Sequence, residues 1–258
     1  MDEMVPPPAP AGRCSEEKIN KYDQGPYHWF LPYFYARKHE RPLELLAPYM
    51  KPTHRVLDLG CGDGRHSALL SGAARTVVGL DNQMLPLQYA YLLIHGGKIS
   101  PRAKRDNVQL CCGDGTRLPF RSRTFDVATC FDMIEHLPTQ RVPAFIEEVG
   151  RVLQPAGLFV IVTPNRANLH NRLWGHHLSE KHYYEYTLHE LCTMMAEHRF
   201  SIDYQAGIYL PPLVLRPYLE HYANVFPIKH VFRLLINAGA RLPEWSEKLF
   251  LIARRQAE

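Results

Sequence analysis

Asp58 to Gly64 read DLGCGDG, and this stretch follows directly on the apolar pair Val56 and Leu57. Its three glycines alternate with other residues, so the backbone can turn tightly and come close to a ligand with no side chain in the way. A helical pattern begins after it, near Arg65. Backbone amides at the start of a helix favour electron-rich groups such as carboxylates. The stretch therefore predicts a ligand-binding turn between a strand and a helix.

The spacing of the glycines separates one class of ligand from another. A dinucleotide fingerprint, G-x-G-x-x-G, would need a glycine at position 65, where this chain has Arg65. A Walker phosphate loop would need Gly-Lys-Ser or Gly-Lys-Thr after the turn, and neither follows. The pattern that remains is D-x-G-x-G-x-G. The plain alternative is a glycine turn that only joins a strand to a helix.

Apolar runs that follow the turn favour the ligand-binding interpretation. The next run, Thr76 to Leu80, ends in Asp81, and a carboxylate at the end of the second strand can accept hydrogen bonds from both ribose hydroxyls. A third run, 108–112, ends beside Asp114. Later segments predict two further strands, a helix from 188 to 197 capped by Thr187, and two last strands. The four expected strands after the third run are 125–132, 158–165, 200–204 and 248–253.

In the order of these elements, residues 54–200 resemble the class I S-adenosylmethionine-dependent methyltransferases, above all the branch that includes ubiquinone-biosynthesis O-methyltransferases. One departure is Ala156, where the family usually has glycine, at a turn remote from the cofactor. The resemblance implies S-adenosylmethionine as the cofactor, with Asp81 on its ribose and Asp114 on its adenine amino group. The cofactor-binding residues that it implies are Asp58, Gly60, Cys61, Gly62, Gly64, Asp81, Asn82, Asp114, Gly115, Thr116 and Phe131.

The alternation of strands and helices from 54 to 165 predicts a parallel sheet with helices on both faces. The resemblance extends this to an α/β fold with a doubly wound, seven-stranded, mostly parallel sheet of the Rossmann-like methyltransferase type. Residues 1–16 are rich in proline, and we expect a disordered tail there. Residues 17–258 are expected to form one methyltransferase domain. Its expected parts are N-terminal cap helices (17–53), a core (54–207 and 247–258) and a helical lid insertion (208–246).

Two of these parts have more than one interpretation. The segment 22–50 is rich in aromatic residues, Trp29 and Phe30 among them, and either covers the cofactor pocket as a cap or packs as a core helix. In the insertion, Pro211-Pro212 opens one helical stretch and Pro227 divides it from a second. The stretch 208–238 is apolar and aromatic with a basic helix face. It covers the acceptor as a lid, or it is a lid that also contacts an anionic membrane surface, or it is plain core.

Candidate catalytic residues follow the fourth strand, in the sequence Asp132-Met133-Ile134-Glu135-His136. If a helix begins near 132, positions 132, 135 and 136 share one face. His136 would then act as a general base, with Glu135 and Asp132 as orienting partners. No metal is assigned. The alternative ligand set, which resembles the D/E-x-x-E-H…H pattern of metal-using members of the superfamily, is Asp132, Glu135, His136 and His182.

Bulk properties limit the partners and the compartment. The net charge of +4 is spread over 258 residues and does not by itself indicate an anionic partner. Six cysteines form no C-x-x-C pair, which favours reduced, buried thiols. The start is acidic and proline-rich rather than signal-like, and no apolar run approaches the roughly 18 residues of a membrane span. We expect a cytoplasmic protein, with peripheral membrane contact as the alternative.

Together these features predict an S-adenosylmethionine-dependent methyltransferase for a small, hydrophobic or aromatic acceptor, with O-methylation favoured over N-methylation. The alternatives are a metal-assisted RNA 2′-O-methyltransferase and a methyltransferase for a lipid-linked substrate at a membrane surface. DNA is not expected as a partner, and RNA is disfavoured. The prolyl-aromatic motif typical of many nucleic-acid amino-methyltransferases is replaced after the fourth strand by the acidic sequence DMIE.

Overall fold

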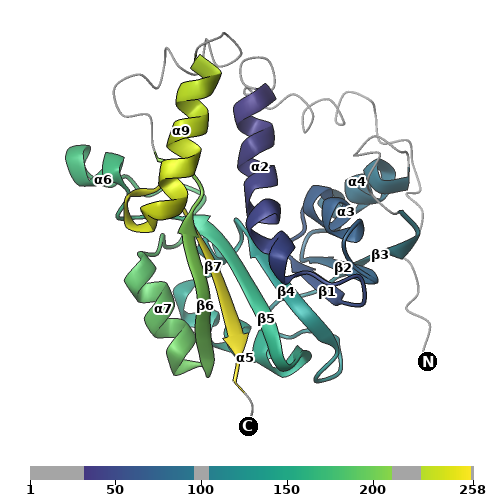
Figure 1. Ribbon diagram of the computed structural model, residues 1–258. Coiled ribbons are helices and arrows are strands. Elements are labelled where there is room, and N and C mark those ends of the chain that lie inside the picture. Colours follow the sequence, from purple (N-terminus) through teal and green to yellow (C-terminus); the bar gives the residue numbers. More distant parts are fainter. Residues whose placement is uncertain (1–31, 96–104, 211–227, 257–258) are drawn as a thin grey trace.

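The structure, a computed structural model, describes residues 32–95, 105–210 and 228–256. Within them, seven strands form one sheet in the order β3-β2-β1-β4-β5-β7-β6 (Figure 1). β1 to β5 pair in parallel, and β7 runs antiparallel to both of its neighbours. The predicted α/β fold with a doubly wound sheet is confirmed. The strands are β1 (Arg55–Leu59), β2 (Thr76–Asp81), β3 (Val108–Cys112), β4 (Phe125–Phe131), β5 (Leu153–Pro164), β6 (Phe200–Gly207) and β7 (Lys248–Arg255).

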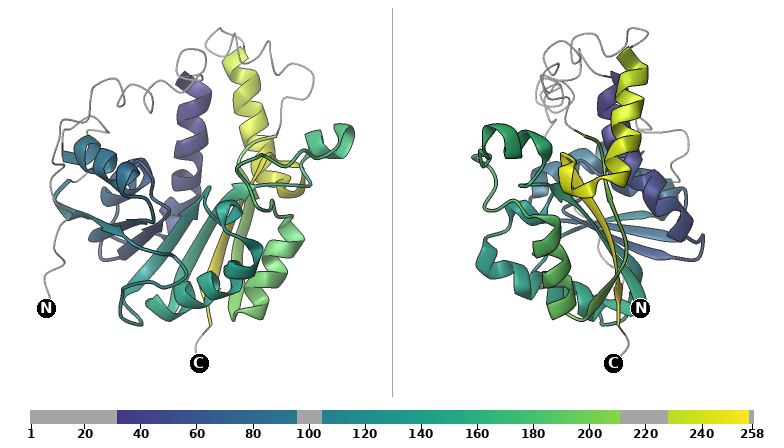
Figure 2. Two further views of the ribbon diagram at one scale, coloured as in Figure 1. Left: turned by 180° about the vertical axis from the view of Figure 1, so that it is seen from behind. Right: turned by 60° about the vertical axis from the view of Figure 1, so that its left-hand side comes forward.

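Helices cover both faces of the sheet (Figure 2). Residues of α5 and α7 join the apolar cluster on one face, and residues of α2, α3, α4 and α9 join the cluster on the other. The α-helices are α2 (Pro32–Leu46), α3 (Arg65–Ser71), α4 (Met84–His95), α5 (Val142–Val152), α6 (Leu169–Trp174), α7 (Leu188–Glu197) and α9 (Ile228–Arg241). The short 3-10 helices are η1 (Ala47–Tyr49), η2 (Arg105–Asn107), η3 (Ile134–His136), η4 (Thr139–Arg141) and η5 (Pro243–Trp245).

The central strands are buried on both faces, which explains why the sequence shows them as continuous apolar runs. In β1, Leu57 and Leu59 enter the cluster beneath α5, and Val56 enters the cluster beneath α3. α7 begins at the predicted cap. The Thr187 hydroxyl oxygen accepts a hydrogen bond from the Glu190 amide (3.3 Å), and the Glu190 carboxylate accepts one from the Thr187 amide (2.7 Å).

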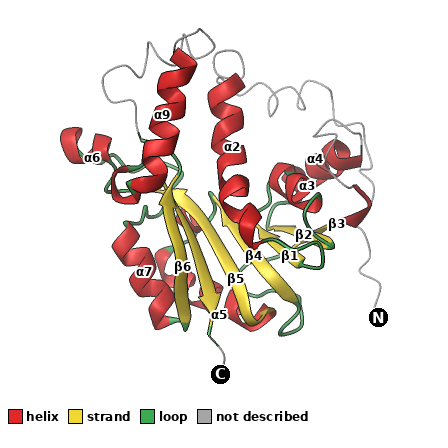
Figure 3. Ribbon diagram, in the orientation of Figure 1, coloured by secondary structure: helices red, strands yellow, loops and turns green. Residues whose placement is uncertain are grey.

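Two helices, α2 and α9, lie side by side and project beyond one end of the sheet (Figures 1 and 3). α2 falls within the segment expected to form cap helices, and α9 falls within the expected lid insertion. The expected tail, the aromatic residues Trp29 and Phe30, and the helical stretch opened by Pro211 lie outside the described residues. Among the residues that are described, no helix has both the length and the apolar character needed to cross a bilayer.

The expectation that a helix begins near Asp132 is wrong. Asp132 has a φ of 53°, in the left-handed region, and cannot open a right-handed helix. Only a 3-10 turn, η3, follows, and it begins at Ile134. The helical spacing that would place Asp132, Glu135 and His136 on one face therefore does not apply.

Ala156 also adopts left-handed geometry, with a φ of 62°. It lies in the first part of β5, where the pairing with β4 is irregular, and its carbonyl oxygen accepts a hydrogen bond from Arg254 (2.9 Å). The left-handed conformation costs an L-residue roughly 1–2 kcal/mol, and glycine adopts it freely. The position where the sequence departs from the family pattern is therefore a position at which the backbone favours glycine.

We expect Ala156→Gly to raise the free energy of unfolding by about 1 kcal/mol, because relief of the left-handed strain exceeds the extra entropy that glycine loses on folding. The matched control is Ala144→Gly in α5, an exposed helical position with the same chemical change. That variant should lose about 1 kcal/mol. Urea denaturation measures both, and equal destabilisation by the two variants would contradict the interpretation of Ala156.

Candidate functional site

A cavity of about 400 Å³ opens at the carboxyl edge of the parallel strands. Gly60 follows β1, Asp81 ends β2, Asp114 follows β3 and Asp132 follows β4, and all four line the cavity. Parallel strands bring their carboxyl ends to one edge, where ligands of doubly wound sheets bind. Residues from four separate strand ends, between positions 60 and 132, therefore meet at a single site.

The glycine turn is fixed by its backbone geometry. Gly60, Gly62 and Gly64 have φ values of 68°, 51° and 73°, all in the left-handed region. A Cβ on Gly60 would lie only 2.4 Å from the Cγ of Met133, and one on Gly115 would lie 3.3 Å from the Met133 Cε. Met133 lines the cavity and occupies the space between these two glycines. The turn thus needs glycine both for its φ angles and, at position 60, for space.

Asp58, the first residue of the motif, lies beneath the turn and is not among the residues that line the cavity. It is 2% exposed, and its carboxylate accepts hydrogen bonds from the hydroxyls of Ser67 (2.6 Å) and Thr129 (2.8 Å). Burial raises the pKa of Asp58 above its usual value. Its contacts join β1 to α3 and to β4, so they support the turn from below.

Asp81 connects the turn to β2. One carboxylate oxygen accepts a hydrogen bond from the Gly62 amide (2.9 Å) and the other accepts one from the Gln83 amide (2.9 Å). Each oxygen of a carboxylate has a second acceptor direction. Asp81 therefore holds the turn and keeps acceptor capacity toward the cavity that it lines.

Asp114 has a comparable position after β3. It accepts hydrogen bonds from the amide and hydroxyl of Thr116, both at 2.9 Å, and it pairs with the guanidinium of Arg141. The hydrogen bond from the Thr116 amide, together with Arg141, lowers the pKa of Asp114. Arg141 also lines the cavity, and no spacing in the sequence indicated it.

The cofactor-binding set from the sequence divides into two groups. Gly60, Asp81, Asn82, Asp114 and Gly115 line the cavity together. The others are not among the residues that line it. Gly62 donates to Asp81, Gly64 precedes α3, Thr116 donates to Asp114, Asp58 and Cys61 are buried, and the Phe131 ring meets the His66 ring edge-on.

Glu135 and His136 lie next to each other on η3, and His136 lines the same cavity. Glu135 is 1% exposed and accepts a hydrogen bond from the Thr163 hydroxyl (3.0 Å). Burial, together with the negative charge of Asp132, raises the pKa of Glu135 to about 7. His136 lines the cavity and donates from Nδ1 to the carbonyl oxygen of Lys181 (2.8 Å). Nε2 is then the basic nitrogen of the neutral ring.

Asp132 has a different partner from the one its spacing indicated. It lines the cavity, but its carboxylate forms an ion pair with Lys248, the first residue of β7. The Lys248 side chain is only 9% exposed. Sequence analysis missed Lys248 because a single cation at the start of an apolar strand carries no periodic signal.

Three of the four candidate metal ligands come together. One oxygen of Glu135 and one ring nitrogen each of His136 and His182 lie within 4.8 Å of one another. Two imidazoles and a carboxylate form a donor set that suits zinc and other first-row divalent cations. Both histidines also bond an oxygen acceptor through Nδ1, the outer contact that metal-bound histidines usually make. The donor set fits a cation, and Asp132 is not part of it.

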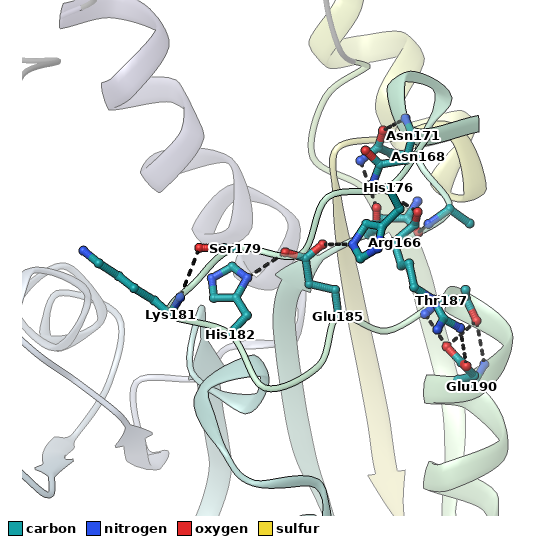
Figure 4. Close-up of polar contacts among 12 residues, drawn as sticks. Arg166, Asn168, Asn171, His176, Ser179, Lys181, His182, Glu185, Thr187 and Glu190 are labelled. Carbon is teal, nitrogen blue, oxygen red and sulfur yellow. Dashed lines mark hydrogen bonds and ion pairs between the residues drawn. The ribbon is translucent and has the colours of Figure 1, made fainter. Parts of the chain in front are cut away.

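His182 reaches this cluster from the connection between α6 and α7 (Figure 4). Its ring meets the His136 ring edge-on, with centroids 4.8 Å apart. Its Nδ1 is 2.6 Å from a carboxylate oxygen of Glu185. Lys181, the residue before it, lines the cavity. The sequence contains several histidines here, but only the fold shows which one approaches His136.

Comparisons with known proteins agree with this geometry. Residues 57–161 match the family model described as "Methyltransferase domain". The chain is 33% identical over 138 residues to a protein of Mycolicibacterium smegmatis named "Probable S-adenosylmethionine-dependent methyltransferase", covering 52% of this chain and 46% of that protein. It is 27% identical to the ubiquinone biosynthesis O-methyltransferase of Haemophilus ducreyi, covering 58% and 65%. It is 26% identical to a sterol 4-C-methyltransferase of Caenorhabditis elegans, covering 80% and 61%.

The chain thus spans less than two thirds of each of these relatives. Solved structures support the fold over a longer range. The PH0226 protein from Pyrococcus horikoshii OT3 superposes with a TM-score of 0.62 at 20% identity, covering 92% of this chain and 99% of that protein. The glycine turn, the acids at the strand ends and the matched residues 57–161 are thus similar to those of S-adenosylmethionine-dependent methyltransferases, whose cofactor is S-adenosylmethionine.

Proposed function

We propose that this protein transfers the methyl group of S-adenosylmethionine to a hydroxyl of a small, hydrophobic or aromatic acceptor. The observation that carries the proposal is that Asp81, Asp114 and His136 line one cavity. Asp81 and Asp114 are the acids expected to hold the ribose and the adenine. His136 offers a basic nitrogen beside them.

The chemistry requires little beyond positioning and removal of a proton. The acceptor oxygen attacks the methyl carbon in line with the departing sulfur, and the C–S bond breaks with its electron pair kept by sulfur. Because the sulfonium donor is already activated, the protein contributes chiefly orientation and exclusion of water. A neutral hydroxyl is a weak nucleophile, so its proton must leave, and Nε2 of His136 is placed to take it.

The neighbouring groups support this role for His136. Glu135, with its pKa of about 7, lies next in sequence, and the Lys181 carbonyl fixes the tautomer of the ring. A divalent cation held by Glu135, His136 and His182 would lower the pKa of a hydroxyl bound to it. Turnover measured with and without a chelator separates these two ways of activating the acceptor.

The hydrophobic character of the acceptor rests on two observations. The relatives named for an acceptor pathway or substrate are a ubiquinone biosynthesis O-methyltransferase and a sterol 4-C-methyltransferase, and both names concern lipid-like molecules. On this chain, apolar side chains are exposed on α6, α9 and η5, among them Trp174, Leu234 and Trp245. A lipid-like acceptor, free or held at a membrane surface, suits such surroundings.

Asp81→Ala should weaken S-adenosylmethionine binding by roughly 10- to 1,000-fold, because it removes acceptors for two hydroxyls and each hydrogen bond to a charged group contributes about 1.5–3 kcal/mol. Calorimetric titration measures the affinity. The control is Asp203→Ala. This change removes a carboxylate of β6 that pairs with Arg254 of β7 and does not line the cavity. Unchanged affinity in the Asp81 variant would remove Asp81 from the cofactor site.

His136→Ala should leave cofactor affinity within about twofold and lower turnover by about 100-fold, since general-base catalysis contributes about that much. Turnover is measured with labelled cofactor on a panel of alkyl catechols, lipid quinone precursors, amines and short RNAs. The control is His198→Ala, because the imidazole of His198 donates from Nδ1 to the Met194 carbonyl in α7 and does not line the cavity. Full turnover in the His136 variant would contradict its role as the base, and preferential labelling of RNA or amines would contradict the proposed acceptor.

A further inference from the structure

Glu185 is a buried carboxylate that contacts two histidines at once (Figure 4). Its Oε1 is 2.6 Å from Nδ1 of His182, and its Oε2 is 2.8 Å from Nε2 of His176. The carboxylate side chain is 9% exposed. A carboxylate can only accept, so each histidine donates an N–H to it. Both oxygens are thereby used to hold imidazoles in fixed tautomers.

These residues lie on the segment from Gly175 to Tyr186, which is hydrogen-bonded directly to η3. The Tyr183 amide donates to the backbone carbonyl of Glu135 (2.8 Å). The carbonyl of Lys181 accepts from Nδ1 of His136 (2.8 Å). One loop therefore fixes the tautomers of both imidazoles in the cluster, that of His136 through its backbone and that of His182 through Glu185.

We propose that Glu185 is a positioning residue of the active site. It fixes His182 with the proton on Nδ1 and leaves Nε2 available to the cluster with Glu135 and His136. Its contact with His176 holds the start of the same loop, so that Lys181 and His182 stay at the cavity wall. This inference rests on the proposed methyl transfer for its effect on turnover, and on geometry alone for its effect on His182.

A second carboxylate in the same region provides a matched control. Glu190 accepts hydrogen bonds from the Thr187 amide (2.7 Å) and the Tyr184 hydroxyl (2.7 Å), and it pairs with Arg166 (2.5 Å). Within the described part of the chain its hydrogen bonds and ion pair go to Thr187, Tyr184 and Arg166 and to no histidine of the cluster, so it caps α7 and holds the end of the loop. Loss of charge at 190 therefore loosens the framework without acting on the tautomer of His182.

The experiment compares Glu185→Gln with Glu190→Gln in the full chain. Ring ¹⁵N chemical shifts of His182, which distinguish a protonated from an unprotonated nitrogen, are recorded above the pKa of free imidazole. Wild type and Glu190→Gln should show the Nδ1–H form of His182, and Glu185→Gln should show a mixture of tautomers. In parallel, kcat and the KM for S-adenosylmethionine are measured with 4-octylcatechol.

We expect Glu185→Gln to lower kcat roughly 10- to 100-fold, the usual cost of losing the outer hydrogen-bond partner of a metal-binding histidine, with KM for the cofactor unchanged. Glu190→Gln should lower the melting temperature and leave kcat within twofold. An unchanged His182 tautomer in Glu185→Gln would overturn the inference, as would an equal loss of kcat in both variants. If wild type binds the cofactor but methylates no acceptor, the proposed function fails, and the His182 signals still decide the role of Glu185.

Discussion

Asp58 makes the contacts on which the cofactor side of this protein depends. Its buried carboxylate joins three elements, β1 from which it comes, α3 through Ser67, and β4 through Thr129. The glycine turn connects the first two of these elements, and η3, which carries Glu135 and His136, follows the third. A buried carboxyl is costly unless its oxygens are bonded, and here both are. The turn can therefore combine three left-handed glycines with a fixed shape.

The residues around the cavity form two walls. The turn, Asp81 and Asp114 form the wall expected to hold the cofactor, and all of them sit at the ends of parallel strands. His136 and Lys181 belong to the other wall, with the buried Glu135 next to His136 and His182 next to Lys181. The two walls meet at Asp132, whose left-handed backbone turns the chain away from β4 and whose carboxylate pairs with Lys248. The carboxylate thereby compensates the charge of the largely buried Lys248 side chain.

The sequence predicted the first wall well and the second only in part, for a physical reason. Buried parallel strands give continuous apolar runs, and the residue after each run must reach the ligand edge, so Asp81 and Asp114 could be placed by position alone. The segment after β4 follows no such rule. A helical spacing was assumed there, and the left-handed Asp132 breaks it. Its pairing with Lys248 joins residues 116 positions apart, which no local pattern encodes.

Motif residues were also predicted more reliably than their roles. Asp58, Cys61 and Phe131 belong to the pattern, yet they do not line the cavity and instead support it. Residues that line the cavity and residues that support it look alike in a one-dimensional pattern. What separates them is the side of the strand on which each residue lies, and that depends on the register of β1 between β2 and β4.

Met133 gives the cavity a property that its backbone alone would not have. Its side chain lies close to both Gly60 and Gly115, so one flexible thioether fills space between the two loops at the cavity. Space that a side chain fills can be enlarged by replacing that side chain with a shorter one, whereas space bounded by glycine backbone cannot be enlarged in this way. This position therefore offers protein engineers a place to admit cofactor analogues with bulkier substituents while the strands, the turn and the acids remain as they are.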